Sequence, residues 1–93
     1  MKTFTINGNH LTSLDDFYLK IEDLFLQNST LKFGKNLDAL NDILYGGFGS
    51  FEENENIEIV WQNFEKSKKL IKNIDLIEQI IKNHKNIFIL FYP

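Results

Sequence analysis

Two aspartates stand four residues apart, Asp38 and Asp42, in the stretch FGKNLDALNDILYGG, and no Lys or Arg lies between them. Side chains at this spacing are neighbours on the surface of a helix, where two like charges repel each other. A pair of carboxylates can serve acid–base catalysis or bind a cationic partner, and it can also be ordinary solvated surface. The rest of the sequence bears on which of these three uses applies.

The helix that carries these aspartates is predicted to begin after Asn36 and to end at Gly46. Asn is a preferred N-cap residue, and Gly commonly follows the last turn of a helix. At about 100° per residue, the predicted helix has an apolar side and a polar side. The apolar side holds Leu37, Leu40, Ile43 and Leu44, and the polar side holds Asp38, Asn41, Asp42 and Tyr45.

From composition alone, solvated surface is the first interpretation of the polar side of this helix, and a catalytic pair is the least favoured. Nothing in the sequence predicts a cleft that would raise the pKa of either carboxyl. A solvated face accounts for Asp38, which the helix macrodipole favours in the first turn, but less well for Asp42. The remaining interpretation is an acidic docking surface for a basic partner, where complementary potentials would steer the encounter and relieve the repulsion.

No other residues form a recognisable catalytic or metal-binding pattern. The chain has no Cys, and its two histidines, His10 and His84, have no further ligands at zinc spacing. His84 falls near a predicted helix C-terminus, where a partly charged imidazole is favourable. The glycines at 46, 47 and 49 match no phosphate-binding pattern. The sequence therefore predicts no cofactor, no metal site and no enzyme.

The composition favours a small cytoplasmic domain without affinity for nucleic acid. The chain has 93 residues, a formal net charge of -3 and no Arg, which is the preferred residue for contacts to phosphates and base edges. The N-terminus has no apolar signal region, and the run IFILFYP is too short to span a bilayer. We expect one domain over residues 1–93, without membrane contact and monomeric when free.

Charge is distributed unevenly along the chain. Residues 36–58 contain only acidic charges, whereas residues 62–86 are rich in Lys. Lys66, Lys68, Lys69 and Lys72 are interpreted as the solvated side of a helix. The acidic residues of the middle segment are Asp38, Asp42, Glu52, Glu53, Glu55 and Glu58.

The predicted order of elements is β-α-α-β-α-α-β, which indicates an α/β domain with a small parallel sheet. Strands are predicted over 3–6, 57–61 and 86–92, and the unbroken apolar run of the last indicates burial on both faces. Helices are predicted over 14–27, after Asn36, over 62–71 with a pair between Glu65 and Lys69, and after a cap at Asn73. The last helix is expected to bury a face of Leu76, Ile77, Ile80 and Ile81, with His84 as a further candidate for this face. In the loop of 46–56, Phe48 and Phe51 are either exposed anchors or folded back onto the core.

The stretch FGKNLDALNDILYG resembles the motif of the barstar family, intracellular inhibitors of the secreted ribonuclease barnase. That motif is approximately an aromatic residue followed by GxNLDALxDxLxG. INGNHLTSLDDFY is similar to the family's first strand, turn and capped helix, and VWQNFEKSKKL to its second strand and third helix. In this second block the matching residues are Trp61, Phe64, Glu65, Ser67 and Lys68; in the motif they are Phe33, Gly34, Asn36, Leu37, Asp38, Ala39, Leu40, Asp42, Leu44 and Gly46.

The resemblance implies a three-stranded parallel sheet with four helices and a protein that blocks the active site of a cognate ribonuclease. In the family, the acid matching Asp42 enters the catalytic pocket at a phosphate subsite, and the acid matching Asp38 contacts basic residues beside it. The Gly matching Gly46 lies at the edge of the same surface. The predicted partner-binding residues are Phe33, Asp38, Asn41, Asp42, Tyr45, Gly46, Gly47 and Phe48.

Three positions depart from the family pattern. Lys32 stands where the family has Tyr, and Asn41 and Gly47 stand where it has Trp. The usual aromatic anchors are therefore absent, and Tyr45, Phe48 and the loop acids are the candidates to replace them. An alternative follows from these departures: a module of the same fold that binds a different basic toxin or protein.

Overall fold

The three predicted strands form one parallel sheet. The computed structural model describes residues 1–26, 34–46 and 48–93 of the chain. In it, β1 (Lys2–Asn7), β2 (Ile57–Gln62) and β3 (Ile87–Phe91) lie in the order β1-β2-β3, with Lys2 opposite Ile57 and Ile57 opposite Ile87. Because β2 and β3 are parallel and Ile57 pairs with Ile87, the two strands start side by side at the same end of the sheet.

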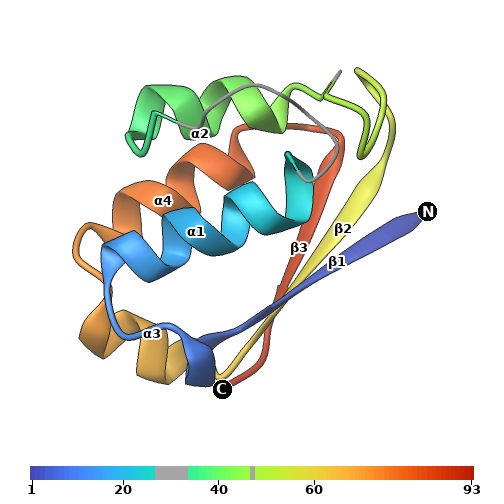
Figure 1. The fold of residues 1–93 in the computed structure, drawn as a ribbon. Helices are drawn as coiled ribbons and strands as arrows, with labels where there is room; N and C mark the ends of the chain where they lie inside the picture. The colour runs from blue at the N-terminus through green and yellow to red at the C-terminus, as the bar shows by residue number, and fades with distance from the viewer. Residues whose placement is uncertain (27–33, 47) are drawn as a thin grey trace.

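The helices lie on one side of this sheet, as Figure 1 shows. They are α1 (Leu14–Phe25), α2 (Leu37–Leu44), α3 (Phe64–Leu70) and α4 (Ile74–Lys82), preceded by a short 3-10 turn, η1 (Gly8–His10). The predicted α/β fold, with four helices and a three-stranded parallel sheet, is confirmed. Within the described ranges, no helix combines the length and the apolar composition that crossing a bilayer requires.

The core lies between the helices and the inner face of the sheet. Alternate residues of β2 are buried, and Trp61 at its end is fully enclosed, with its ring stacked on Phe17 at 5.3 Å between centroids. The indole Nε1 of Trp61 donates a hydrogen bond to the Oγ of Ser67 on α3 at 3.0 Å. This bond satisfies the polar atoms of two buried residues, so α3 is fixed against the sheet without an unpaired group.

The prediction that β3 is buried on both faces is wrong. Phe88, Leu90 and Tyr92 are 49%, 43% and 52% exposed, whereas Ile87 is buried. The helices cover only one face of the sheet, so alternate side chains of β3 point away from the core (Figure 1). The apolar run of β3 therefore places large apolar side chains on the uncovered face of the sheet.

Three details predicted for α3 and α4 are also wrong. Asn73 makes no side-chain cap bond, because its backbone is left-handed (φ 63°) and turns the chain from α3 into α4. Glu65 pairs with Lys68 at 3.8 Å instead of with Lys69. On α4 the buried residues are Ile74, Ile77 and Ile81, while Leu76 is 47% exposed.

Candidate functional site

The helix α2 forms as predicted and is held firmly in place. The Oδ1 of Asn36 accepts a hydrogen bond from the backbone N–H of Ala39 at 2.8 Å, which caps its first turn. Its apolar side packs against the core and α4, with Leu40, Ile43 and Leu44 buried. The opposite side of α2 therefore faces away from the core.

Asp38 and Asp42 lie on this outer side and are both exposed. In the part of the chain that the structure describes, neither carboxylate takes part in an ion pair or a side-chain hydrogen bond. Two negative groups are thus held on a capped, packed helix and are available to a partner. This is the arrangement that the docking-surface interpretation requires.

Asn41 and Tyr45, on the same side of α2, both contact His84. The Oδ1 of Asn41 lies 2.8 Å from the Nε2 of His84. The ring of Tyr45 meets the imidazole edge-on, with centroids 4.7 Å apart, and the tyrosine remains 58% exposed. The side-chain carbonyl of Asn41 is therefore already hydrogen-bonded within the protein, while Tyr45 remains largely exposed.

His84 is a buried link between α2 and the turn that precedes β3. Only 6% of the residue is exposed, and burial lowers the pKa of its imidazole below the ordinary value. The expectation of a partly charged imidazole at a helix end is therefore wrong, because burial penalises the charged form. A neutral ring has one nitrogen that donates and one that accepts.

The end of α2 is fixed by Gly46. Its φ is 91°, and a Cβ there would lie 2.9 Å from the carbonyl oxygen of Glu52 and 2.9 Å from the ring of Phe51. Phe51 is buried and Phe48 packs partly buried against the core, so both loop aromatics fold back. Gly46 is itself buried. Its backbone conformation and its packing therefore explain why glycine stands here, and no contact with a partner is needed to explain it.

Two of the predicted binding residues, Phe33 and Gly47, lie outside the described residues, as does Lys32. Of the remaining six, the structure brings Asp38, Asn41, Asp42 and Tyr45 together on the outer side of α2. Phe48 and Gly46 lie at its end, turned more toward the core than outward.

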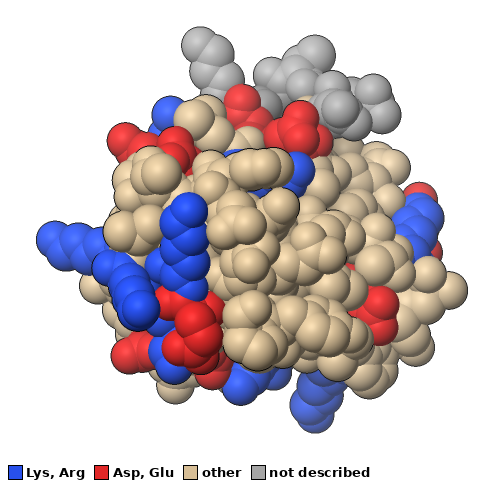
Figure 2. All heavy atoms as spheres, turned by 90° about the horizontal axis from the view of Figure 1, so that it is seen from below, with Lys and Arg blue, Asp and Glu red and all other residues tan. Residues whose placement is uncertain are grey.

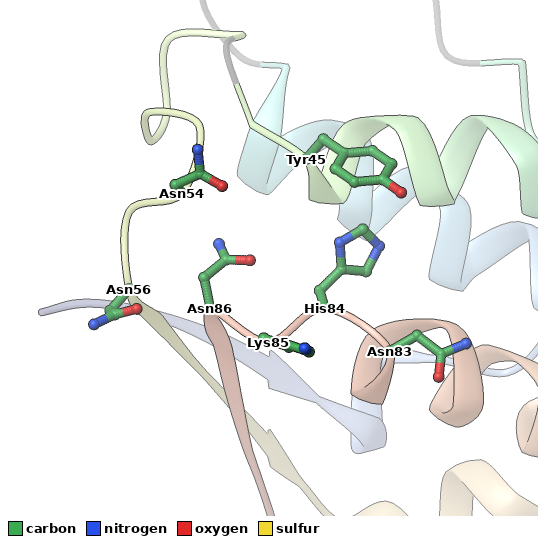
Figure 3. Close-up of a pocket in the computed structure, with 7 residues that line it drawn as sticks. All are labelled: Tyr45, Asn54, Asn56, Asn83, His84, Lys85 and Asn86. Carbon is green, nitrogen blue, oxygen red and sulfur yellow. The ribbon is translucent and has the colours of Figure 1, made fainter.

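A polar cavity of about 360 Å³ opens beside the end of α2. Its walls are Tyr45, two asparagines of the loop before β2 and the four residues of the turn before β3, 83–86 (Figure 3). This cavity was not among the features predicted from the sequence. A signal was present: Asn56 and Asn86 each precede one of two strands that start side by side, because Ile57 pairs with Ile87.

The acidic side of α2 and the Lys-rich helix α3 lie at opposite ends of the molecule (Figure 1). α2 lies at the top of Figure 1 and α3 at the bottom. Figure 2 looks onto the lower end and shows that Lys side chains are most numerous on one side of it, with Asp and Glu side chains among them. The exposed lysines of α3 and the turn after it are Lys66, Lys68, Lys69 and Lys72. Among the described residues, no three His, Asp or Glu side chains gather in a way that could hold a metal ion.

Together, the fold and the site define a small α/β domain that presents two exposed carboxylates on a capped helix. The chain belongs to the Barstar family: the family model described as Barstar (barnase inhibitor) matches residues 1–86. A comparison with curated proteins gave no match.

Proposed function

We propose that this protein binds a basic ribonuclease inside the producing cell and blocks its active site with the outer side of α2. Membership of the Barstar family supports the class of target. The single observation that carries the mechanism is the exposed pair Asp38 and Asp42, which has no cation partner among the described residues. In this proposal the protein is an antitoxin or immunity protein and has no catalytic activity.

The chemistry of the target explains why carboxylates suit this role. A ribonuclease must hold a phosphodiester with positively charged side chains. Carboxylates on α2 satisfy those same groups, and the cap at Asn36 and the packing of Leu40 and Leu44 hold the helix in place before binding. Little conformational entropy is then lost when the complex forms. The repulsion between Asp38 and Asp42 is tolerated because binding relieves it.

The test is inhibition of a basic microbial ribonuclease, beginning with barnase, by an excess of this protein. Asp42→Ala is expected to weaken inhibition by at least about 30-fold, the effect of removing one member of a desolvated charge pair. Asp23→Ala is the matched control, because it also removes one negative charge from a helix surface, on α1. Equal losses for both variants, or no inhibition by the wild type of any basic ribonuclease tested, would contradict the proposal.

A second candidate is a basic partner that is not a ribonuclease. The observation that favours it is the position of Asn41, which stands in place of an aromatic anchor and turns its carbonyl to His84. Affinity capture from cells that encode this chain separates the two candidates. A captured basic protein without ribonuclease activity would favour the second, and a captured ribonuclease would favour the first.

A further inference from the structure

The cavity at the end of α2 continues the acidic docking face. Asp38, Asp42 and Tyr45 follow one another at helical spacings of four and three residues, so they form one stripe along α2. Tyr45 is also a wall of the cavity. A partner that covers the two aspartates therefore also meets the mouth of the cavity.

We propose that this cavity receives the guanidinium group of an arginine side chain from the partner. The inference rests on the proposed function, because it adds a second contact to the same docking face. The groups that would hold the guanidinium are neutral acceptor atoms and helix C-terminal ends, and these are distinct from the carboxylates of Asp38 and Asp42. Three features of the cavity favour such a group: the helix ends, the acceptor atoms and the tyrosine ring.

Two helices point their C-terminal ends at the cavity. Tyr45 is the C-cap of α2 and Asn83 is the C-cap of α4, and both residues line it. The C-terminus of a helix carries a partial negative charge of about half an elementary charge, which favours cations. The cavity is therefore a favourable place for a positive group even though no carboxylate lines it.

Two acceptor atoms are available in the cavity. The Nδ2 of Asn86 donates to the carbonyl oxygen of Glu55 at 2.8 Å, which fixes the amide and leaves its Oδ1 turned toward the opening (Figure 3). The Oδ1 of Asn41 can only accept, so the Nε2 of His84 carries the proton. The other ring nitrogen, Nδ1, is then an acceptor, and it lies on the side of Asn86 (Figure 3).

The protonation of His84 agrees with this assignment. Burial lowers the pKa of the imidazole, so the ring is neutral at neutral pH and Nδ1 keeps its lone pair. No described residue bonds to Nδ1, and no buried side-chain nitrogen or oxygen of the described residues lacks a partner. Nδ1 is therefore open to solvent or to a ligand.

The ring of Tyr45 selects a planar cation. It stands above His84 and keeps 58% of the residue exposed (Figure 3). A guanidinium stacks on aromatic faces and presents several donors in one plane, whereas an ammonium is a compact and strongly hydrated charge. The combination of one ring and two separated acceptors therefore suits arginine better than lysine. Lys85, which also borders the cavity, opposes any cation and weakens the site.

The experiment is a titration of the ¹⁵N-labelled protein followed by NMR. The probes are the N-acetyl amides of arginine, lysine, glutamine and glutamate. Arginine is expected to give saturable shifts at Tyr45, Asn54, His84 and Asn86 in the millimolar range, with weaker shifts for lysine and none for the other two. Binding of the glutamate probe in preference to arginine, or no localised shift with arginine, would overturn the proposal.

Two variants test the assigned atoms. His84→Gln retains an amide that can donate to Asn41 but has no atom that corresponds to Nδ1, so it should weaken arginine binding by about 2- to 10-fold, the value of one hydrogen bond. Lys85→Gln, at an exposed position that does not endanger folding, should instead strengthen binding. A loss of affinity in Lys85→Gln would show that the cavity is not a cation site.

The outcome is independent of the ribonuclease assay. The probes are small molecules and the protein is used alone, so the cavity can bind arginine even if no ribonuclease is inhibited. Conversely, inhibition that depends on Asp42 without any arginine binding would retain the proposed function and remove this inference.

Discussion

The outer side of α2 differs from the surfaces of the other three helices in how its charges are used. α1 pairs Lys20 with Asp23, α3 pairs Lys68 with Glu65, and α4 pairs Lys82 with Glu78, each within the helix. α2 carries only negative charge and, among the residues that the structure describes, no such pair. Each of the other three helices therefore contains one internal ion pair, whereas α2 contains none among the described residues.

The difference also extends to packing. α2 is short, yet it is capped at Asn36, ended by a constrained glycine and linked to the turn before β3 through His84. A helix that carries an unfavourable charge pair needs such support, because its own electrostatics oppose it. The support also gives a partner a surface that needs no ordering on binding.

The largest expected effect is the loss of partner binding when a charge is reversed on α2, compared with the same reversal on α1. Asp42→Lys should weaken binding to the inhibited ribonuclease by at least about 1,000-fold, because it removes an attraction and adds a repulsion at a desolvated contact. Asp23→Lys changes the net charge equally on α1 and should reduce the association rate only slightly. Surface plasmon resonance at two salt concentrations measures both; similar losses in the two variants would break the contrast between the helices.

The constraint at the end of α2 predicts a large loss of stability. Gly46→Ala should lower the free energy of unfolding by about 2–4 kcal/mol, because it combines strain at positive φ with a collision against Glu52 and Phe51. Gly49→Ala is the matched control, since Gly49 has φ 99° and nothing within 4 Å of an added Cβ. It should cost about 1–2 kcal/mol. Urea denaturation measures both; equal costs would show that the end of α2 is not tightly held.

His84 makes the support of α2 sensitive to pH. Its pKa is lowered in the folded protein, so the unfolded chain binds more protons as the pH falls below about 6.5. Stability should therefore be fully present above that pH and decline as the pH falls through the folded pKa, by at most about 1.4 kcal/mol per pH unit. Thermal unfolding between about pH 7.5 and 5 measures the decline.

The variant His84→Gln provides the control for this decline, because Gln does not titrate and can still donate to Asn41. His10 is present in both proteins, so the comparison isolates His84. Asp16 and Glu55 also have lowered pKa values, through hydrogen bonds from Thr12 and from the backbone of Glu52, but they act in the acidic range below their ordinary values of 3.8 and 4.5. A decline that is identical in the variant would exclude His84 as its source.

The fold could be predicted because its signals are local. Asn36 and Gly46 mark the ends of α2, and the alternation of β2 and the periodicity of α1 each specify one element. The exposure of β3 could not be predicted in this way. Phe88 and Leu90 are apolar, and only the tertiary arrangement, with helices on one face, decides that they remain outside.

The candidate site also has a part with a local sequence signal and a part that depends on the tertiary arrangement. Asp38 and Asp42 could be found from their spacing, because helix geometry places them on one side. The link from Asn41 to His84 joins residues 43 positions apart, and the cavity joins a loop to a distant turn. No periodicity connects such segments; the loop and the turn at the cavity meet because the sheet brings the starts of β2 and β3 together.

The smallest predicted effect compares α2 and α4 most directly, because the expected changes in the free energy of unfolding have opposite signs. Asp42→Asn in the free protein removes a repulsion and should raise the free energy of unfolding by about 0.2–0.5 kcal/mol. Glu78→Gln on α4 breaks the 2.9 Å pair with Lys82 and should lower it by a similar amount. Both variants replace one carboxylate by its amide, so shape and net charge change equally. Denaturation at low salt measures both shifts, and high salt should shrink each toward zero. If Asp42→Asn destabilised the protein as Glu78→Gln does, the carboxylate of Asp42 would already be satisfied within its own chain and would not be free for a partner.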